Sequence, residues 1–216
     1  MLKVLFSLLL LLHLAVANHL TPQIPKAYSW TFMESVTAWG SSAEEVSFGS
    51  HTLGHQAAGD RIIKAHVLNG TSSLSFLFCD NKNVKFEYFP FNNTCGAGEE
   101  ASELDCFNVL GASVLGRSVV TAEYPCLGNP SHTCQNRFLF GPIARGLFIN
   151  ATLYLEFLED NVHYIPTRVI LVGQFGRETM YFTMTTASYV ADPSPNPFDR
   201  KGWGWPAACG REPFTR

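Results

Sequence analysis

Two histidines at helical spacing are the first residues in this sequence that could do chemistry. His51 and His55 stand four residues apart, as two zinc ligands on one face of a helix would. The segment that holds them, Gly49-Ser50-His51-Thr52-Leu53-Gly54-His55, contains glycines that disfavour a helix, and it lacks the glutamate of an H-E-x-x-H motif. We therefore expect a structural or merely exposed role for both histidines, and the sequence names no metal ligand.

The sequence gives little support for a cysteine or serine nucleophile. His132 stands close enough to Cys134 in the sequence to suggest a Cys–His pair. In an exported protein, however, a cysteine more often belongs to a disulfide, and the six cysteines have irregular spacing with no C-x-x-C pair. The sequence contains no G-x-S-x-G elbow, phosphate-binding glycine loop or dinucleotide fingerprint. We therefore expect a protein that is not an enzyme.

Acidic pairs are the remaining polar groups of interest. They fall in predicted loops, at Glu44-Glu45, Glu99-Glu100 and Glu159-Asp160. Such pairs are most often solvated surface, but loop carboxylates can bind calcium, and paired carboxylates in a cleft can hydrolyse glycosides. A calcium site and a secreted hydrolase therefore stay open as alternatives.

The N-terminus predicts export. Lys3 precedes an apolar run from Val4 to Val16, and Ala15-Val16-Ala17 forms an A-x-A cleavage site, so residues 1–17 are expected to be a signal peptide. The run is shorter than the ~20 apolar residues of a membrane helix, which disfavours an uncleaved anchor. Three N-x-[ST] triplets agree with a secreted, extracellular protein and predict glycans at Asn69, Asn92 and Asn150.

Composition indicates one globular domain over residues 18–216. Charged residues make up 15% of the chain and aromatic residues 13%, including 17 phenylalanines. This balance argues against disorder and suits strands with large apolar faces. A formal net charge of −3 gives no electrostatic reason to expect nucleic acid as a partner.

Period-two alternation predicts strands. The clearest strand covers Leu147–Leu158, with Leu147, Ile149, Ala151, Leu153, Leu155 and Phe157 on one face and Asn150, Thr152, Tyr154 and Glu156 on the other. Further strands are predicted at Arg61–Leu68, Ser73–Phe78, Val84–Phe89, Val114–Ala122, Thr167–Val172 and Thr179–Val190. Asn69-Gly70 predicts an antiparallel hairpin between the first two of these. One short helix is predicted within Gly98–Leu110.

Several short motifs then follow one another in a particular order. Gly59-Asp60-Arg61-Ile62 opens a strand, Asn92-Asn93-Thr94-Cys95 comes later, and Ala191-Asp192-Pro193 with Phe198, Pro206 and Cys209 ends the domain. This succession resembles the ependymin-related proteins over roughly residues 45 to 210. Two cysteines that pair with each other in that family are both missing here, one near the mature N-terminus and one before a Pro-Val step.

The resemblance implies a fold and a disulfide. Cys95 and Cys209 match the family pair that ties the third strand region to the C-terminal tail. Two further bridges then form, in one of three pairings, among Cys79, Cys106, Cys126 and Cys134. In one of these pairings Cys126–Cys134 closes a short loop, and Cys79–Cys106 is the remaining bridge. The implied fold is all-β with minor helix: two antiparallel sheets forming a curved half-barrel or sandwich, disulfide-stapled, with an apolar pocket between them.

The leading functional hypothesis is a secreted, non-enzymatic glycoprotein that binds an apolar, lipid-like ligand in a β-walled pocket, with calcium at surface carboxylates. Alternation suggests pocket residues, for each of which a plain core role is the alternative: Phe76, Phe78, Phe86, Leu153, Leu155, Phe182 and Met184. The competing hypothesis is an extracellular matrix or cell-adhesion module with a solid core. The resemblance also implies a homodimer and contacts with the matrix.

Overall fold

The computed structural model describes residues 20–25, 27–41, 44–56, 59–68, 74–79, 86–89, 92–97, 108–143, 146–192 and 206–210. These residues form eleven strands that join in one antiparallel sheet. The predicted signal peptide at residues 1–17 lies outside the described residues. The single-domain boundary at residues 18–216 stays a prediction.

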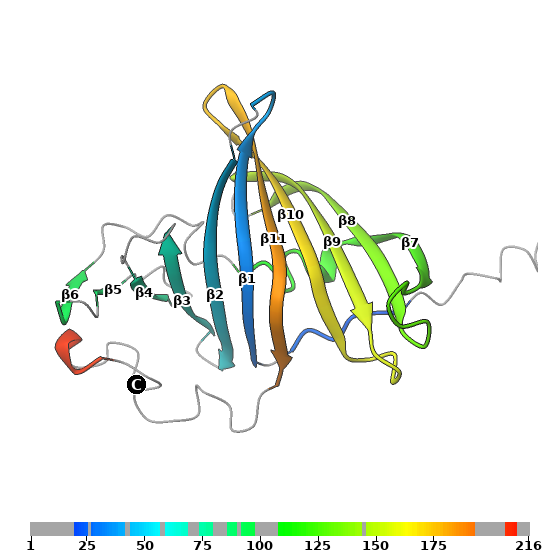
Figure 1. Ribbon diagram of the computed structural model, residues 1–216, viewed down its shortest axis with the longest axis horizontal. Coiled ribbons are helices and arrows are strands. Elements are labelled where there is room, and N and C mark those ends of the chain that lie inside the picture. Colours follow the sequence, from blue (N-terminus) through cyan, green and yellow to red (C-terminus); the bar gives the residue numbers. More distant parts are fainter. Residues whose placement is uncertain are drawn as a thin grey trace, which may run out of the picture.

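The sheet consists of two meanders that meet at its centre. There β1 (Ala27–Ala38), the first described strand along the chain, pairs with β11 (Glu178–Ala191), the last (Figure 1). On one side the order continues through β2 (Glu44–Gln56), β3 (Gly59–Leu68), β4 (Leu74–Cys79), β5 (Phe86–Phe89) and β6 (Thr94–Ala97). On the other side it continues through β10 (Tyr164–Phe175), β9 (Phe148–Phe157), β8 (Thr133–Ile143) and β7 (Val119–Pro125).

The all-β prediction is confirmed, and so is the predicted hairpin. It is formed by β3 and β4, with Ile63 opposite Phe78. The expectation of two sheets is corrected to one continuous sheet, which curves without closing on itself (Figure 1). Because every strand pairs with its neighbour, the hollow side of the protein is the concave face of one sheet and not a gap between two sheets.

Alternation along the central strands separates the two faces of the sheet. In β1 the side chains of Tyr28, Trp30 and Phe32 are almost fully buried, whereas Met33 on the other face is 53% exposed. The same period of two buries Leu153 and Leu155 in β9. These buried positions share one face, the concave one, which holds the hydrophobic core.

Residues 108–118 cover part of the concave face. Four of their side chains, Val109, Leu110, Val114 and Leu115, are buried in the same cluster as the inward residues of β1 and β9. The predicted strand Val114–Ala122 therefore begins only at Val119. Before it, the Leu115 and Ser118 amides donate to the carbonyls of Gly111 and Val114, which makes a tight turn ending in η1 (Leu115–Arg117).

A bulge at the start of β9 reverses which side chains point to the core. Asn150 pairs with Val172 of β10, but Phe148 pairs with the next residue, Gly173, so Ile149 is the extra residue. Phe148 is buried and Ile149 is 39% exposed. The prediction that Ile149 shares a face with Leu153 is therefore wrong, because one inserted residue reverses the alternation.

Two disulfides fix the periphery. Cys95–Cys209 joins β6 to η3 (Ala207–Cys209), and Cys126–Cys134 closes the connection between β7 and β8. The predicted pairing of Cys79 with Cys106 and most of the predicted helix, residues 98–107, lie outside what the structure describes. The described part of the chain contains no helix with the length and apolar character of a membrane span.

Candidate apolar ligand site

An apolar floor extends across five strands of the concave face. Backbone pairing places Val36, Phe182, Leu171, Ala151 and Leu139 side by side, one each from β1, β11, β10, β9 and β8. Paired residues on adjacent strands point to the same face, so their side chains form one row. The last three are buried, whereas Val36 and Phe182 are partly exposed. The floor therefore opens to the surface toward β1 and β11.

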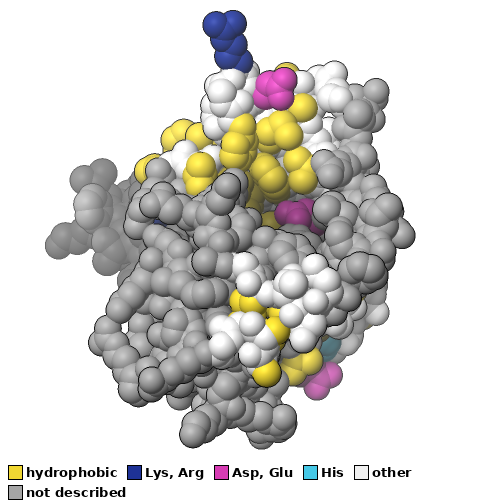
Figure 2. Space-filling view, turned by 90° about the vertical axis from the view of Figure 1, so that its left-hand side faces the viewer, with side chains coloured by type: hydrophobic (Ala, Val, Ile, Leu, Met, Phe, Trp, Pro, Cys, Tyr) yellow, Lys and Arg dark blue, Asp and Glu magenta, His cyan; other side chains and the backbone are white. Residues whose placement is uncertain are grey.

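Three phenylalanine rings, here called the aromatic cluster, meet at one end of this floor. The ring centroid of Phe182 lies 5.6 Å from those of Phe148 and Phe175, which are 6.5 Å from each other. Phe148 is buried, but Phe175 and Phe182 keep part of their surface accessible. Figure 2 shows hydrophobic side chains gathered at this end of the molecule, below the tips of the β1–β2 and β10–β11 turns.

Gly173 makes room for the aromatic cluster. A Cβ atom added at this position would lie 2.5 Å from Cε2 of Phe175 and 2.9 Å from the backbone oxygen of Leu147. The Phe175 ring therefore lies directly against the backbone of β10. Glycine inside a strand often marks such a close approach, and here it fixes where the ring sits.

The predicted pocket residues fall into three groups. Leu153 and Leu155 are fully buried in the core and Met184 is 8% exposed, so these three form the closed part of the floor. Phe182 lies at its open end. Phe76 and Phe78 are in β4 and Phe86 is in β5, opposite Phe78, but their side chains lie outside the described part of the structure.

Buried polar side chains from β8 hold the N-terminal segment, residues 20–25, on the concave side. The Gln135 side-chain amide donates to the backbone carbonyl of Leu20 at 2.9 Å and to Oε2 of Glu123 at 2.8 Å. Arg137, only 8% exposed, donates to Oε1 of Gln135 at 2.8 Å, and desolvation lowers its pKa. Sequence reasoning missed this network, since two polar residues at inward positions interrupt the apolar alternation that signals a strand.

Tyrosines occupy the opposite end of the concave face. The ring centroid of Tyr189 lies 5.9 Å from that of Tyr28 and 6.0 Å from that of Tyr164. The Tyr28 hydroxyl donates to Oδ1 of Asn108 at 3.1 Å. Within the described structure the buried hydroxyls of Tyr164 and Tyr189 have no hydrogen-bond partner, and burial raises the pKa of both.

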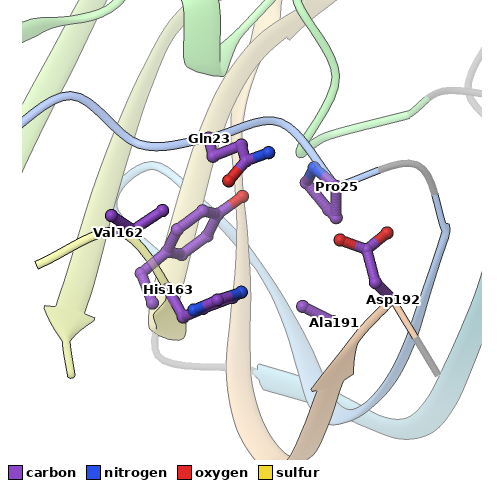
Figure 3. A pocket seen from close by; sticks show the side chains of 7 residues that line it. Gln23, Pro25, Val162, His163, Ala191 and Asp192 are labelled. Atoms are coloured by element: carbon purple, nitrogen blue, oxygen red, sulfur yellow. The ribbon is translucent and has the colours of Figure 1, made fainter. Parts of the chain in front are cut away.

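A small cavity of about 10 Å³ lies beside these tyrosines. It is lined by Tyr164 together with Gln23, Pro25, Val162, His163, Ala191 and Asp192 (Figure 3). The Asp192 carboxylate is fixed at its edge by the backbone N–H of Ala27, at 3.1 Å. This volume has room for about one water molecule, so a lipid cannot bind here.

An exposed Asp–His pair forms the turn between β9 and β10. Oδ1 of Asp160 accepts from the amides of Val162 and His163, each at 2.9 Å, and Oδ2 contacts Nδ1 of His163. The hydrogen bond to His163, followed by the two amides, lowers the pKa of Asp160 to about 2. The same carboxylate raises the pKa of His163. Local hydrogen bonds within a turn account for both shifts, so they do not mark a catalytic group.

The other candidate chemical groups are placed as follows. Cys134 is in a disulfide and is therefore no nucleophile, while Nδ1 of His132 lies 2.7 Å from Oε1 of Glu156. His51 and His55 lie in a strand, β2, and not in a helix. No group of three or more potential metal ligands occurs among the described residues.

The predicted glycan acceptors differ in setting. Asn92 is exposed in the turn between β5 and β6, where its Oδ1 accepts from the Thr94 hydroxyl at 2.6 Å. Asn150 is partly exposed within β9. Asn69 lies outside the described residues.

Comparison with known proteins gives only distant likenesses. No protein-family model matches the sequence, and no curated protein matches it. A DUF1329 family protein from Desulfovibrio piger is similar in structure, with a TM-score of 0.38 and 9% identity over 78% of this chain and 86% of that one. A putative outer membrane lipoprotein-sorting protein domain from Vibrio parahaemolyticus gives a TM-score of 0.37 and 7% identity, over 76% and 85% of the two chains.

Proposed function

We propose that this protein is secreted, has no enzymatic activity and binds an apolar, lipid-like ligand at the aromatic cluster. The observation that carries the proposal is the partial exposure of Phe175 and Phe182 at the end of an otherwise buried apolar floor. Removing apolar surface from water stabilises a complex by about 25 cal/mol per Å². A hydrocarbon chain laid along these rings would continue the floor that Leu171 and Ala151 begin.

The sequence and the disulfides support the proposed compartment. Two disulfides fit an oxidising environment outside the cytoplasm, and the apolar N-terminal run with its cleavage site supports secretion. The Cys95–Cys209 bridge also supports membership of the ependymin-related family, which we retain as a proposal. Calcium binding, matrix contacts and a homodimer rest on that resemblance alone, and titration calorimetry with calcium and light scattering test the first and the last.

Native mass spectrometry of protein secreted from eukaryotic cells is the direct test, followed by organic extraction of whatever co-purifies. We expect a fatty acid or other lipid at a near-stoichiometric amount. A companion experiment measures uptake of a fluorescent fatty acid by the wild type and by Phe182→Gln, which we expect to weaken binding about tenfold or more. That factor corresponds to about 1.4 kcal/mol, less than the burial of one phenylalanine side chain contributes.

Met33→Gln is the matched control for Phe182→Gln. It makes the same kind of change at a 53% exposed position of β1 on the convex face, so fatty acid uptake should not change. A ligand-free mass combined with no uptake by the wild type would refute the carrier hypothesis. Equal losses in both variants would show that the aromatic cluster is not the site.

An extracellular interaction module is the second candidate, and one observation favours it. Trp39 is 75% exposed and stacks on Tyr181, with the ring centroids 5.8 Å apart. Large aromatic side chains at a surface often form protein contacts. If the wild type takes up no fatty acid and Trp39→Ala dissociates a stable dimer in light scattering, this second function replaces the first.

A further inference from the structure

Asn150 has an unusual position for a glycan acceptor. It lies inside a strand, β9, where it alternates with the buried Ala151 and so faces the convex side, while across the bulge at Ile149 the Phe148 side chain points into the core. The acceptor triplet continues through Ala151, which is buried, to Thr152, which faces outward with Asn150. The amide nitrogen that would carry a sugar is therefore presented on the surface of the sheet and not at a loop tip.

An exposed aromatic ring lies directly beside this acceptor. In the ladder between β8 and β9, Phe140 pairs with Asn150, and the Phe140 side chain is 77% exposed. Paired residues have Cβ atoms about 4.5–5.5 Å apart and point to the same face. On its other side Asn150 pairs with Val172, which is only 8% exposed. Phe140 is thus the neighbour that offers free apolar surface within reach of the first sugar.

We propose that the first N-acetylglucosamine of a glycan on Asn150 packs against the ring of Phe140 and covers it. One face of this sugar consists of C–H groups, so it gains dispersion contacts and removes apolar surface from water when it lies on an aromatic ring. The covalent bond to Asn150 supplies the proximity that a free sugar would lack. The inference rests on the secretion included in the proposed function and on the glycan that the sequence predicts at Asn150, but not on the lipid site.

A second copy of the chain is the competing occupant for Phe140. Exposed apolar side chains often mark protein contacts, and a dimer could bury the ring. The glycan is the better fit because a bulky, solvated sugar at the paired residue would keep another chain away from this part of the sheet.

Thermal unfolding of four secreted proteins tests the contact. They are the protein with and without Asn150→Gln, each with and without Phe140→Ala, all carrying Asn69→Gln and Asn92→Gln so that one acceptor remains. The proteins are secreted from cells that make only high-mannose glycans, which endoglycosidase H trims to a single N-acetylglucosamine. We expect Asn150→Gln to lower Tm by about 2–4 °C when Phe140 is present, and by less than a third of that in Phe140→Ala.

Met33→Ala provides the control for apolar surface in general. Met33 is exposed on the convex face of β1, three strands away from Asn150 in the sheet order, so its replacement should leave the effect of the sugar on Tm unchanged. Peptide mapping of the secreted protein reports occupancy of Asn150, and light scattering reports the oligomeric state.

Each adverse outcome has a distinct meaning. An unoccupied Asn150 overturns this contact together with the glycosylation at that residue. An occupied Asn150 whose sugar changes Tm equally with and without Phe140 overturns the contact alone. A dimer that dissociates in Phe140→Ala assigns the ring to a second copy of the chain.

Discussion

Arg137 and Ser118 are joined by two hydrogen bonds in the interior of the protein. Nε of Arg137 donates to the Ser118 hydroxyl at 2.8 Å, and Nη2 donates to the Ser118 backbone carbonyl at 2.7 Å. Ser118 ends the segment that covers the concave face, and its hydroxyl in turn donates to the carbonyl of Leu115 at 2.8 Å. The guanidinium thus fastens that segment to β8.

Replacing this guanidinium by an ammonium should therefore destabilise the protein. Arg137→Lys keeps the charge but cannot reproduce the fork, so buried acceptors lose their donor at a cost of about 1–3 kcal/mol in the free energy of unfolding. Arg168→Lys, at an exposed position of β10, is the matched control and should stay within about 0.5 kcal/mol. Urea unfolding measures both, and equal effects would show that the fork contributes nothing.

The unpartnered tyrosine hydroxyls predict an asymmetry among three conservative variants. Tyr164→Phe and Tyr189→Phe each remove a buried hydroxyl without a partner, so their stability should be unchanged or higher. Tyr28→Phe removes the bond to Asn108 and should cost about 0.5–1.5 kcal/mol. Chemical denaturation ranks the three, and a Tyr164→Phe variant less stable than Tyr28→Phe would contradict the assignment.

The same two tyrosines predict unfolding in alkali. Burial raises the pKa of Tyr164 and Tyr189 above the ordinary value of about 10. Their contribution to stability is therefore complete below about pH 10 and is lost as the pH rises further, because the unfolded chain releases these protons first. Ultraviolet absorbance of phenolate should report their ionisation only together with the loss of circular dichroism. Ionisation of every tyrosine in a still folded protein would contradict this prediction.

Gly173→Ala should disturb the aromatic cluster. The added methyl meets the Phe175 ring and the Leu147 carbonyl, so Phe175 must move, at a cost of about 1–3 kcal/mol. Fatty acid uptake should fall in the same variant if the cluster is the binding site. Gly128→Ala is the control, since no atom lies within 4 Å of an added Cβ there. Comparing the two variants by thermal unfolding and fluorescence separates a local clash from a general effect of losing glycine.

The exposed turn between β9 and β10 predicts a histidine with a raised pKa. The pKa of His163 should exceed the ordinary value of about 6.5 in a nuclear magnetic resonance titration and return toward it in Asp160→Asn. The stabilising effect of the pair is fully present between about pH 4 and pH 6.5. It is lost above that range as His163 deprotonates, and below it as Asp160 is protonated near its pKa of about 2. An unshifted His163 in the wild type would mean that the turn is open in solution.

The two described disulfides should differ in their contribution to stability. Cys95–Cys209 spans 114 residues and Cys126–Cys134 spans 8. By the entropy of loop closure in the unfolded chain, the first contributes about 5 kcal/mol and the second about 2.5 kcal/mol. Paired Cys→Ser variants measured by urea unfolding test the order, and a larger loss for the short loop would reverse it.

Alternation and turn residues predicted those parts of the fold that leave a signal within a few consecutive residues. Alternation found most of β9 and β11 and half of β10, and Asn69-Gly70 located the β3–β4 hairpin. No strand was predicted at β1, β2 or β8. In β8 the reason is that Gln135 and Arg137 point inward, and their partners at Leu20, Glu123 and Ser118 are brought near only by the fold. To expect that network from the sequence, five residues from distant places would have to be considered together.

The candidate site was predictable only in part for a similar reason. Phe182 and Met184 follow from alternation, but a strand residue can line a pocket or fill a core with the same pattern. What separates Phe182 from Leu153 is the segment 108–118 and the curvature of the sheet, and neither has a signature in the strand itself. Phe148 and Phe175 join Phe182 because of a bulge and a glycine, which alternation does not reveal.

The pairing of β1 with β11 has a consequence for the order in which a ribosome delivers the chain. β1 can pair with β2 soon after both emerge, but its other edge waits for a strand that begins about 140 residues later. At about 5–20 residues per second this takes on the order of 10 s. During translation, the nascent chain thus carries an open edge at what becomes the middle of the sheet, a site where chaperones would be needed most.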